Sequence, residues 1–234
     1  MTTTLITGAN KGLGLETARR LAGAGHTVYL GARDLRRGSE AAHRIGARAV
    51  PIDVTDDESV RAAAKLVGDE AGSLDVLVNN AGIAGTARPA GETTADDMLT
   101  VYEANVFGAV RVLHAFLPLL KASPAPIVVN VGSGLGSLAA TVDPHARAVV
   151  PDWIPVLAYS SSKAALNMVT AQYAHAFPAM RINAVDPGFT ATDLNGHAGR
   201  QTVAEGAEII VRMATTGPGG PTGGFFSAAG PIPW

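Results

Sequence analysis

The segment Thr7-Gly8-Ala9-Asn10-Lys11-Gly12-Leu13-Gly14 follows an apolar run, Thr3–Thr7, and opens a helical pattern, Gly14–Ala24. Glycines between a strand and a helix let the backbone approach a pyrophosphate, and the helix N-terminus supplies N–H groups and positive potential. A glycine-rich turn alone is weak evidence, because many are ordinary tight turns, but the strand–turn–helix context strengthens it. The segment predicts a dinucleotide phosphate site. The residues expected to contact the cofactor there are Gly8, Asn10, Lys11, Gly12, Leu13 and Gly14.

Short apolar strands alternate with longer helical patterns along the rest of the chain. The predicted strands are Thr3–Thr7, Thr27–Gly31, Arg48–Ile52, Val76–Asn79, Ile127–Val131, Arg181–Val185 and Gly224–Ser227. The predicted helices are Gly14–Ala24, Ser39–Ile45, Asp57–Glu70, Thr94–Leu117, Tyr159–Ala176 and Val203–Ala214. Most strands lack polar alternation, as expected when both faces of a parallel sheet are covered. The pattern predicts an α/β fold: a Rossmann-type doubly wound parallel sheet flanked by helices, forming a single domain over residues 1–234.

Composition narrows the classes of function. The chain has 234 residues, a net charge of −2 and no cysteine. No broad basic surface for nucleic acid is therefore expected. Disulfides, thiolate catalysis and cysteine metal sites are excluded, and the histidines are scattered without metal-ligand spacing. The first residues show no signal-peptide pattern, and no stretch approaches the ~20 apolar residues of a membrane span, so a reducing cytoplasm is the simplest location.

Tyr159-Ser160-Ser161-Ser162-Lys163 places a phenol and an ammonium on one face of a predicted helix. An ordinary tyrosine, with a pKa of ~10, holds its proton firmly near neutrality. A nearby ammonium and a positive nicotinamide would lower that pKa, which makes Tyr159 a usable acid in reduction or base in oxidation. A tyrosine on a helix surface is common. Together with Lys163 and the glycine-rich turn, however, Tyr159 indicates a nicotinamide-dependent oxidoreductase.

Two cations lie near the expected position of the adenosine ribose. Arg33 ends the second predicted strand, and Lys11 belongs to the glycine-rich turn. An acidic side chain there would bind a free 2′-hydroxyl, whereas a cation favours a 2′-phosphate. Either cation, taken alone, could equally well be a solvated surface charge. Their joint occurrence favours NADP(H), with NAD(H) as the alternative. Asp34 is ambiguous, because it could instead cap the next helix.

Polar residues end the following strands. Asp53 is expected to accept from the adenine amino group while Val54 packs the ring. Asparagines in a turn often tie loop backbone together, so Asn79 and Asn80 are expected to be mainly structural. Ala81 and Gly82 are expected to face the cofactor, and Asn80 is counted with them as a contact.

Ser133 lies just past the fifth predicted strand, at the edge where doubly wound sheets bind ligands. Its hydroxyl can hydrogen-bond a substrate oxygen on which negative charge develops. Ser137 is the alternative, further into the loop.

Taken together, these motifs resemble the short-chain dehydrogenase/reductase family. The matching pieces appear in the family's order and cover nearly the whole chain: Thr7–Gly14, Asp53, Asn79–Gly82, Asn105, Ser133, Tyr159–Lys163 and Pro187–Gly188. A further likeness to the carbonyl-reductase branch rests on Asn10–Gly12, Ala32–Asp34, the extra segment before Tyr159 and the ending Gly220–Ser227. Gly132 departs from the family's two successive serines, but Ser133 matches the second, catalytic one.

The resemblance implies a catalytic tetrad of Asn105, Ser133, Tyr159 and Lys163. In the family the lysine also holds the nicotinamide ribose, as Tyr159 and Lys163 would here, and the asparagine holds a water that links the lysine to solvent. Because asparagine is a poor mid-helix residue, a local kink is the alternative role for Asn105. The resemblance also implies that the nicotinamide end, with its pro-S hydride exposed, contacts Pro187, Gly188, Phe189, Thr190 and Thr192.

The substrate end is predicted from the insertion before Tyr159 and from the short segment Thr190–Thr202. Trp153 either walls an apolar pocket or anchors the loop on the core, and His145 is expected to be solvated. The short second segment suggests an open, apolar pocket for ketones, aldehydes or quinone-like carbonyls. The predicted lining residues are Gly134, Trp153, Leu157, Phe189 and Leu194.

The leading interpretation is an NADPH-dependent reductase of small carbonyl compounds. A NAD-preferring alcohol dehydrogenase of the same family is the second. A non-catalytic dinucleotide-binding sensor is the third, since a fold does not settle function. A monomer and a homo-oligomer both stay open, as do two roles for Trp234, packing the chain end or reaching a neighbour.

Overall fold

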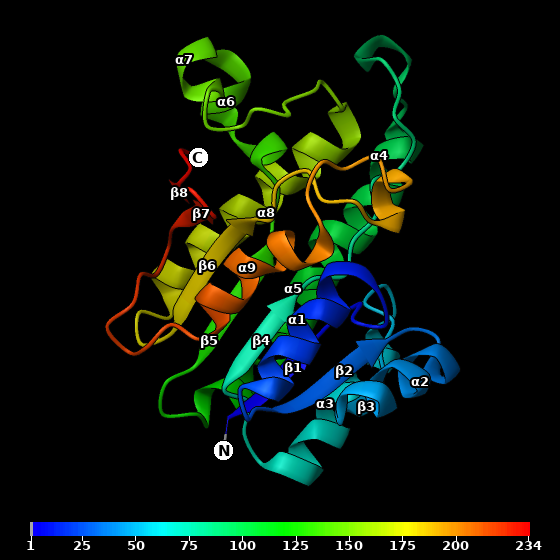
Figure 1. Ribbon diagram of the computed structural model, residues 1–234, viewed down its shortest axis with the longest axis vertical. Coiled ribbons are helices and arrows are strands. Elements are labelled where there is room, and N and C mark those ends of the chain that lie inside the picture. Colours follow the sequence, from blue (N-terminus) through cyan, green and yellow to red (C-terminus); the bar gives the residue numbers. More distant parts are fainter. Residues whose placement is uncertain (1) are drawn as a thin grey trace.

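A computed structural model of the protein describes residues 2–234. It contains an eight-stranded sheet in the order β3-β2-β1-β4-β5-β6-β7-β8, in which β7 and β8 are antiparallel and the other neighbouring pairs are parallel (Figure 1). The strands are β1 (Thr3–Ile6), β2 (Thr27–Ala32), β3 (Arg48–Pro51), β4 (Val76–Asn79), β5 (Ile127–Val131), β6 (Arg181–Asp186), β7 (Phe225–Ser227) and β8 (Gly230–Pro231). The strand order reverses between β1 and β4, so the predicted doubly wound sheet is confirmed.

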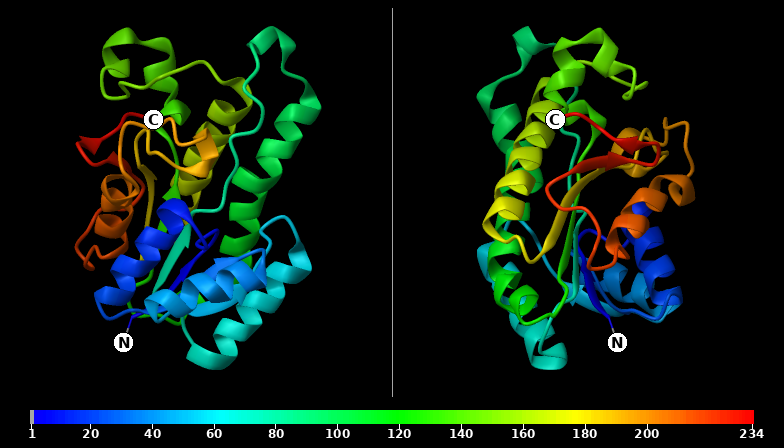
Figure 2. Two further views of the ribbon diagram at one scale, coloured as in Figure 1. Left: turned by 45° about the vertical axis from the view of Figure 1, so that its right-hand side comes forward. Right: turned by 90° about the vertical axis from the view of Figure 1, so that its left-hand side faces the viewer.

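Helices cover both faces of this sheet, which makes a three-layer fold (Figure 2). The α-helices are α1 (Gly12–Gly23), α2 (Leu35–Ile45), α3 (Asp57–Ala71), α4 (Ala95–Tyr102), α5 (Gly108–Lys121), α6 (Leu138–Val142), α7 (Pro144–Arg147), α8 (Leu157–Ala176) and α9 (Val203–Ala214). Side chains of α1, α2 and α9 share one core cluster with the sheet, and those of α3, α5 and α8 share the other.

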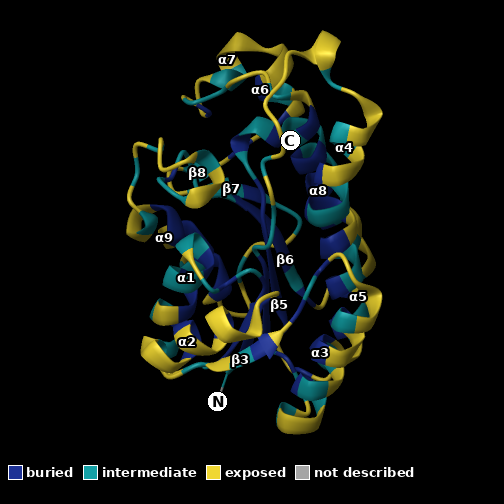
Figure 3. Ribbon diagram, turned by 90° about the vertical axis from the view of Figure 1, so that its right-hand side faces the viewer, coloured by how far each residue is buried: buried dark blue, intermediate teal, exposed yellow. Residues whose placement is uncertain are grey.

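Successive strand residues point into opposite core clusters. Ile6 of β1 packs in the α1 and α9 cluster, and its neighbour Leu5 packs in the α3 and α5 cluster. Both are fully buried, and Figure 3 shows the strands buried between helices whose outer surfaces are exposed. Two covered faces explain why the strands are apolar throughout rather than alternating.

The second helix starts earlier than its sequence pattern predicts. α2 begins at Leu35 rather than Ser39. The carboxylate of Asp34 accepts the backbone N–H of Arg37 at 3.0 Å and caps the helix. Of the two roles considered for Asp34, the structure therefore shows the helix cap.

The long predicted helix Thr94–Leu117 is interrupted. A π-helical turn, η2 (Glu103–Phe107), separates α4 from α5 and contains Asn105. By length and composition the whole run, Ala95–Lys121, could cross a membrane, although half of its most apolar window is buried inside the fold. The prediction that no stretch approaches the length of a membrane span was therefore wrong, and the burial is that of a core helix.

The chain end has structure that the sequence pattern did not predict. The strand β8 pairs with β7, and the short helices α6 and α7 lie in the insertion before Tyr159. Trp234 stacks on Phe225 with ring centroids 5.6 Å apart, and its carbonyl accepts the N–H of Ala139 at 2.9 Å. Trp234 therefore packs the end of the chain onto the fold.

Candidate active site

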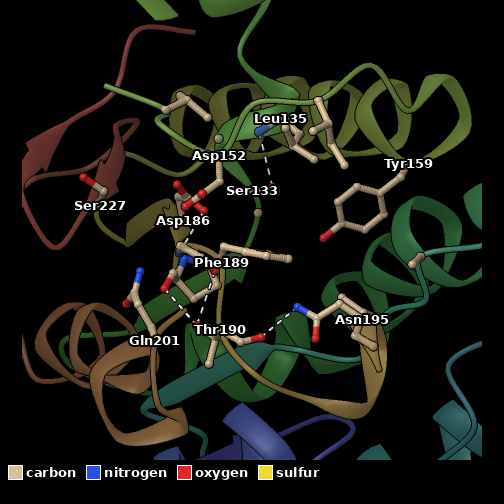
Figure 4. Close-up of a pocket in the computed structure, with 18 of the residues that line it drawn as sticks. Ser133, Leu135, Asp152, Tyr159, Asp186, Phe189, Thr190, Asn195, Gln201 and Ser227 are labelled. Atoms are coloured by element: carbon tan, nitrogen blue, oxygen red, sulfur yellow. Dashed lines mark hydrogen bonds between the residues drawn. The ribbon is translucent and has the colours of Figure 1, made fainter. Parts of the chain in front are cut away.

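A cavity of about 500 Å³ opens where β5 and β6 end at the carboxyl edge of the sheet. Its wall comes from the turn η3 (Gly134–Gly136), the segment before α8, the start of α8, and the segments after β6 and β7. Most of the wall is apolar, and Tyr159, Ser133 and Asp186 are among its polar side chains (Figure 4). A small, largely apolar molecule with one polar centre fits this lining.

The glycine-rich turn has the geometry that a phosphate group needs. Gly8 and Gly12 have positive φ values of 63° and 55°, which side-chain-bearing residues rarely adopt. A Cβ on Gly14 would lie 2.6 Å from Nδ2 of Asn80. The first turn of α1 has no side-chain cap, since its N-cap residue, Lys11, forms no such hydrogen bond. Free N–H groups and a close backbone fit a dinucleotide pyrophosphate.

The two predicted ribose-phosphate cations are placed differently. Nζ of Lys11, in the glycine-rich turn, donates to Oδ2 of Asp193 at 2.6 Å. Both side chains are exposed. Arg33 is exposed at the end of β2. Its charge helps to hold the pKa of Asp53 below the ordinary value: burial of that carboxyl opposes ionisation, but hydrogen bonds from Thr55 and the charge of Arg33 outweigh it. Arg33 therefore lies near the expected adenosine site, while Lys11 is already paired.

The adenine-side residues are held mainly by the protein itself. Oδ1 of Asp53 accepts the N–H and hydroxyl of Thr55 at 2.9 and 2.7 Å. Val54 is buried, and a Cβ on Gly108 would lie 2.8 Å from its Cγ2. Val54 thus packs against the start of α5, three residues beyond the end of β3 at Pro51.

Asn80 braces the glycine-rich turn. Its Nδ2 donates to the carbonyl oxygens of Thr7 and Gly8 at 2.9 and 3.1 Å, and Asn79 donates to Oδ1 of Asn130 at 2.9 Å. Both asparagines thus tie segments of the protein together. The side chain of Asn80 is directed at the turn, which is the structural role expected for it, and its contact with the cofactor stays a prediction.

Replacing this brace gives a first prediction. Asn80→Ala should lower the free energy of unfolding by about 1–3 kcal/mol, because two carbonyl groups lose their donor. Urea unfolding measures the change. Asn10→Ala in the same turn is the matched control, and we expect it to change stability by less than about 0.5 kcal/mol. Equal stability of Asn80→Ala and wild type would contradict the bracing role.

Tyr159 and Ser133 face the same cavity from different elements. Tyr159 lies in the first turn of α8 and points into the cavity, and Ser133 follows β5 (Figure 4). Burial and the charge of Asp186 raise the pKa of Tyr159, whereas the neighbouring hydroxyl of Ser133 acts in the opposite direction. The sequence predicted that neighbouring charged groups of the protein would lower the pKa of Tyr159. The structure shows the opposite direction, because burial of the phenol outweighs the group that lowers its pKa.

Lys163 is buried, with its ammonium over the ring of Tyr159. Nζ lies 5.5 Å from the centroid of the Tyr159 ring and donates to the carbonyl of Val131 at 2.8 Å. Burial lowers the pKa of Lys163 to about 8, and Asp186 acts in the opposite direction.

Asn105 joins the π-turn to the segment after β4. Its Oδ1 accepts the N–H of Ile83 at 2.8 Å, and its Nδ2 donates to the Ile83 carbonyl and to Oγ of Ser162. A Cβ on Gly82 would lie 3.0 Å from Asn105 Oδ1 and 3.7 Å from Nζ of Lys163. The structure thus brings Asn105, Gly82 and Lys163 together, and Asn105 sits in the local distortion considered for it.

The alternative serine lies elsewhere. Ser137 is fully buried, and its hydroxyl donates to the carbonyl of Pro233 at 2.7 Å and accepts the N–H of Ala140. These contacts tie the chain end to α6. Ser133, rather than Ser137, therefore meets the cavity.

The segment after β6 folds compactly over one side of the cavity. Gly188 has a φ of 73°, and Thr190 is buried and pairs with Gln201 in a short parallel bridge. Asn195 donates to the Thr190 carbonyl at 2.9 Å. The residues of this segment and of the glycine-rich turn that line the cavity include Leu13, Pro187, Gly188, Phe189, Thr190, Thr192 and Leu194.

Two predicted substrate-pocket residues are displaced from the wall. Gly134, Phe189 and Leu194 line the cavity, but Trp153 and Leu157 do not. The guanidinium of Arg147 lies 4.0 Å from the Trp153 ring centroid, and Trp153 packs against the small core cluster beneath α6. Leu157 starts α8 with its side chain partly exposed. These two assignments were wrong, because the loop directs Ile154 and Val156 to the cavity instead.

Sequence reasoning missed the carboxylates of the cavity. Asp152 and Asp186 both line it, and Asp152 pairs with Arg200. The available signal was an acidic residue that ends an apolar strand directly before Pro187-Gly188. Among residues 2–234, no group of three metal-ligating side chains gathers.

Comparisons with known proteins agree with this geometry. The family model described as short chain dehydrogenase matches residues 2–202. A short-chain dehydrogenase of Penicillium roqueforti is 39% identical over 225 residues, which cover 91% of this chain and 88% of that protein. (−)-Isopiperitenone reductase of Mentha piperita is 34% identical, with 95% of each chain covered.

Comparison with solved structures identifies the same family. NADPH-bound carbonyl reductase from chicken fatty liver superposes with a TM-score of 0.86 at 27% identity, over 100% of this chain and 99% of that one. Salutaridine reductase from Papaver somniferum gives a TM-score of 0.84 at 28% identity, over 97% and 100%. With the glycine-rich turn, the doubly wound sheet and the tyrosine–lysine helix in place, the chain belongs to the short-chain dehydrogenase/reductase family of oxidoreductases.

Proposed function

We propose that the protein is an NADPH-dependent reductase that converts a small, largely apolar carbonyl compound to an alcohol. The observation that carries the proposal is that Tyr159 and Ser133 face one apolar cavity at the carboxyl edge of the sheet, with the buried ammonium of Lys163 over the tyrosine ring. Relatives named for reactions on carbonyl or alcohol compounds, such as (+)-neomenthol dehydrogenase of Arabidopsis thaliana at 34% identity, support this substrate class.

Each part of the cofactor has residues that would hold it. The uncapped first turn of α1 and the glycine-rich turn would bind the pyrophosphate. Arg33 would contact the 2′-phosphate, helped by Lys11 if that side chain leaves Asp193. Lys163 would hold the nicotinamide ribose, and the segment Pro187–Thr192 the nicotinamide end. A bound NADPH would supply the hydride.

The protein's own groups complete the reduction. Ser133 donates a hydrogen bond to the carbonyl oxygen and stabilises its developing negative charge. Tyr159 gives that oxygen its proton while the carbonyl carbon receives the hydride, so that an alcohol leaves. The ammonium of Lys163 stabilises the phenolate that remains. Asn105 fixes the chain segment next to Lys163. A proton from solvent can return to the site at this point.

The test is the initial rate of NADPH and NADH oxidation with aldehydes, activated ketones, quinones and cyclic terpenoid ketones. Turnover that prefers NADPH and requires Tyr159 supports the proposal. Turnover that prefers NADH indicates the dehydrogenase alternative, for which the pairing of Lys11 with Asp193 is the favouring observation. Tight dinucleotide binding without turnover on any of these carbonyls supports the sensor and contradicts the reductase.

A second prediction concerns cofactor preference. Arg33→Ala should weaken NADPH binding about 10- to 100-fold, because a charge-assisted hydrogen bond to phosphate is lost, and should leave NADH binding within twofold. Titration of cofactor fluorescence measures both affinities. Arg36→Ala is the control, since Arg36 is an exposed arginine that pairs with Glu40 on α2. Equal losses for the two cofactors would remove Arg33 from the 2′-phosphate site.

A further inference from the structure

Asp186 is a polar residue of the cavity that the proposed mechanism does not use. It is the last residue of β6, and its carboxylate lies in the cavity close to Ser133 (Figure 4). The backbone register explains this position. Val185 pairs with Val131 of β5, and Gly132 donates to the Val185 carbonyl at 2.7 Å. Asp186, the residue after Val185, therefore lies beside the turn that carries Ser133.

The carboxylate of Asp186 touches two separate turns. Oδ1 accepts the backbone N–H of Gly188 at 3.0 Å. Oδ2 lies so close to Gly134 that a Cβ there would be 2.9 Å away, and the N–H of Gly134 faces the same carboxylate. One side chain thus links the turn after β5 with the turn after β6.

The two linked turns carry different halves of the proposed reaction. Ser133, which would meet the substrate oxygen, directly precedes Gly134. Phe189 and Thr190, which would meet the nicotinamide end, directly follow Gly188. Hydride transfer needs the substrate carbon and the nicotinamide at a fixed separation, and a misplacement of about 1 Å costs about 10²-fold in rate. A side chain that contacts both turns is placed to set that separation.

We propose that Asp186 is a positioning residue, whose carboxylate clamps the Ser133–Gly134 turn to the Pro187–Gly188 turn and so aligns the substrate oxygen with the nicotinamide. This inference rests on the proposed carbonyl reductase activity. It assigns to Asp186 no contact with the reacting atoms.

The negative charge of Asp186 also affects the pKa values of the ionisable groups around it. Its charged and titratable neighbours are Asp152 on the segment before α8, and Tyr159 and Lys163 on α8. Burial raises the pKa of Asp186, the N–H groups of the two turns lower it, Asp152 raises it and Lys163 lowers it. When ionised, Asp186 raises the pKa of both Tyr159 and Lys163, which keeps both groups protonated for reduction.

The first arm of the test needs no turnover. Asp186→Ala should weaken NADPH binding about 5- to 20-fold, while the affinity for 2′-phospho-ADP-ribose, which lacks the nicotinamide, stays within twofold. Asp186→Asn keeps an acceptor for Gly188 and should recover part of the NADPH affinity. Asp152→Asn, which removes the neighbouring charge but leaves Asp186 in place, should leave the ratio of the two affinities unchanged. Thermal unfolding checks that each variant is folded.

The second arm uses a carbonyl that wild type reduces and Tyr159→Phe does not. Asp186→Ala should lower kcat about 10- to 100-fold with a smaller change in the KM for the carbonyl. In both Asp186 variants the alkaline limb of kcat/KM should move to lower pH by about half a unit to one unit, because Tyr159 and Lys163 lose a neighbouring negative charge. A purely structural role would not move this limb.

The outcomes separate the two proposals. If wild type reduces no carbonyl, the proposed function fails, and the first arm still decides whether Asp186 aligns the nicotinamide end. If folded Asp186→Ala binds NADPH and 2′-phospho-ADP-ribose as wild type does, the clamp is overturned. Unchanged kcat and an unmoved alkaline limb in an active enzyme would overturn it as well.

Discussion

Tyr159→Phe should lower kcat for carbonyl reduction by about 10³-fold while leaving NADPH affinity within about twofold of wild type. The side chain lies in the wall of the cavity, where its hydroxyl is the proton donor of the proposed reaction. General acid catalysis by a positioned side chain contributes about 10²–10⁴-fold. Phenylalanine keeps the ring that packs near Nζ of Lys163, so the surroundings stay in place and only the proton donor is removed.

A tyrosine on the same helix provides the control. Tyr173 is half-buried on α8 and packs against Phe177, with ring centroids 5.9 Å apart, and it does not line the cavity. Tyr173→Phe should retain full kcat. Steady-state and single-turnover rates at saturating NADPH measure both variants. If Tyr159→Phe kept the wild-type rate in single turnovers, another group would be the acid and the assignment of Tyr159 would be wrong.

The sheet could be predicted from sequence because its physical signal is local. Each strand is a short apolar run bounded by glycine, proline or polar residues, and the glycine-rich turn fixes where the first strand ends and the first helix begins. The start of α2 was missed because it depends on one side-chain hydrogen bond, from Arg37 N–H to Asp34. At Asn105 the sequence indicated only a local kink as one of two roles, because the π-turn there is stabilised by tertiary contacts with Ile83 and Ser162, and the helical periodicity continues on both sides.

The candidate site, like the fold, has features that the sequence could predict and features that it could not. Ser133 and Tyr159 could be placed together because a strand end and a helix start meet at one edge of a parallel sheet. The pKa of Tyr159 could not be predicted, because it depends on burial and on Asp186, which reaches the cavity from another strand. Trp153 was misplaced for a related reason: loop side chains have no periodic pattern, so the stacking of Arg147 on its ring could not be deduced.

Lys163→Met should lower kcat about 10²-fold or more and also remove a pH dependence of stability. The ammonium would stabilise the phenolate left by Tyr159, and electrostatic groups of this kind contribute about 10²–10³-fold. The wild-type rate should fall as pH rises through about 8, because burial lowers the pKa of Lys163 to about that value and the ammonium is lost above it. Methionine fills similar space without a charge.

Stability should change in the opposite direction over the same pH range. The pKa of Lys163 falls from 10.5 to about 8 on folding, so between these values the unfolded chain binds more protons and the folded state gains stability as pH rises. Between pH 7 and 9.5 wild type should gain roughly 2 kcal/mol relative to Lys163→Met. Lys121→Met is the control, since Lys121 also lies over an aromatic ring, 5.2 Å from the centroid of Phe177, but is exposed. Urea unfolding at a series of pH values compares the three proteins. Parallel stability curves for wild type and Lys163→Met would mean that the buried ammonium keeps an ordinary pKa, and the alkaline loss of activity would then need another titrating group.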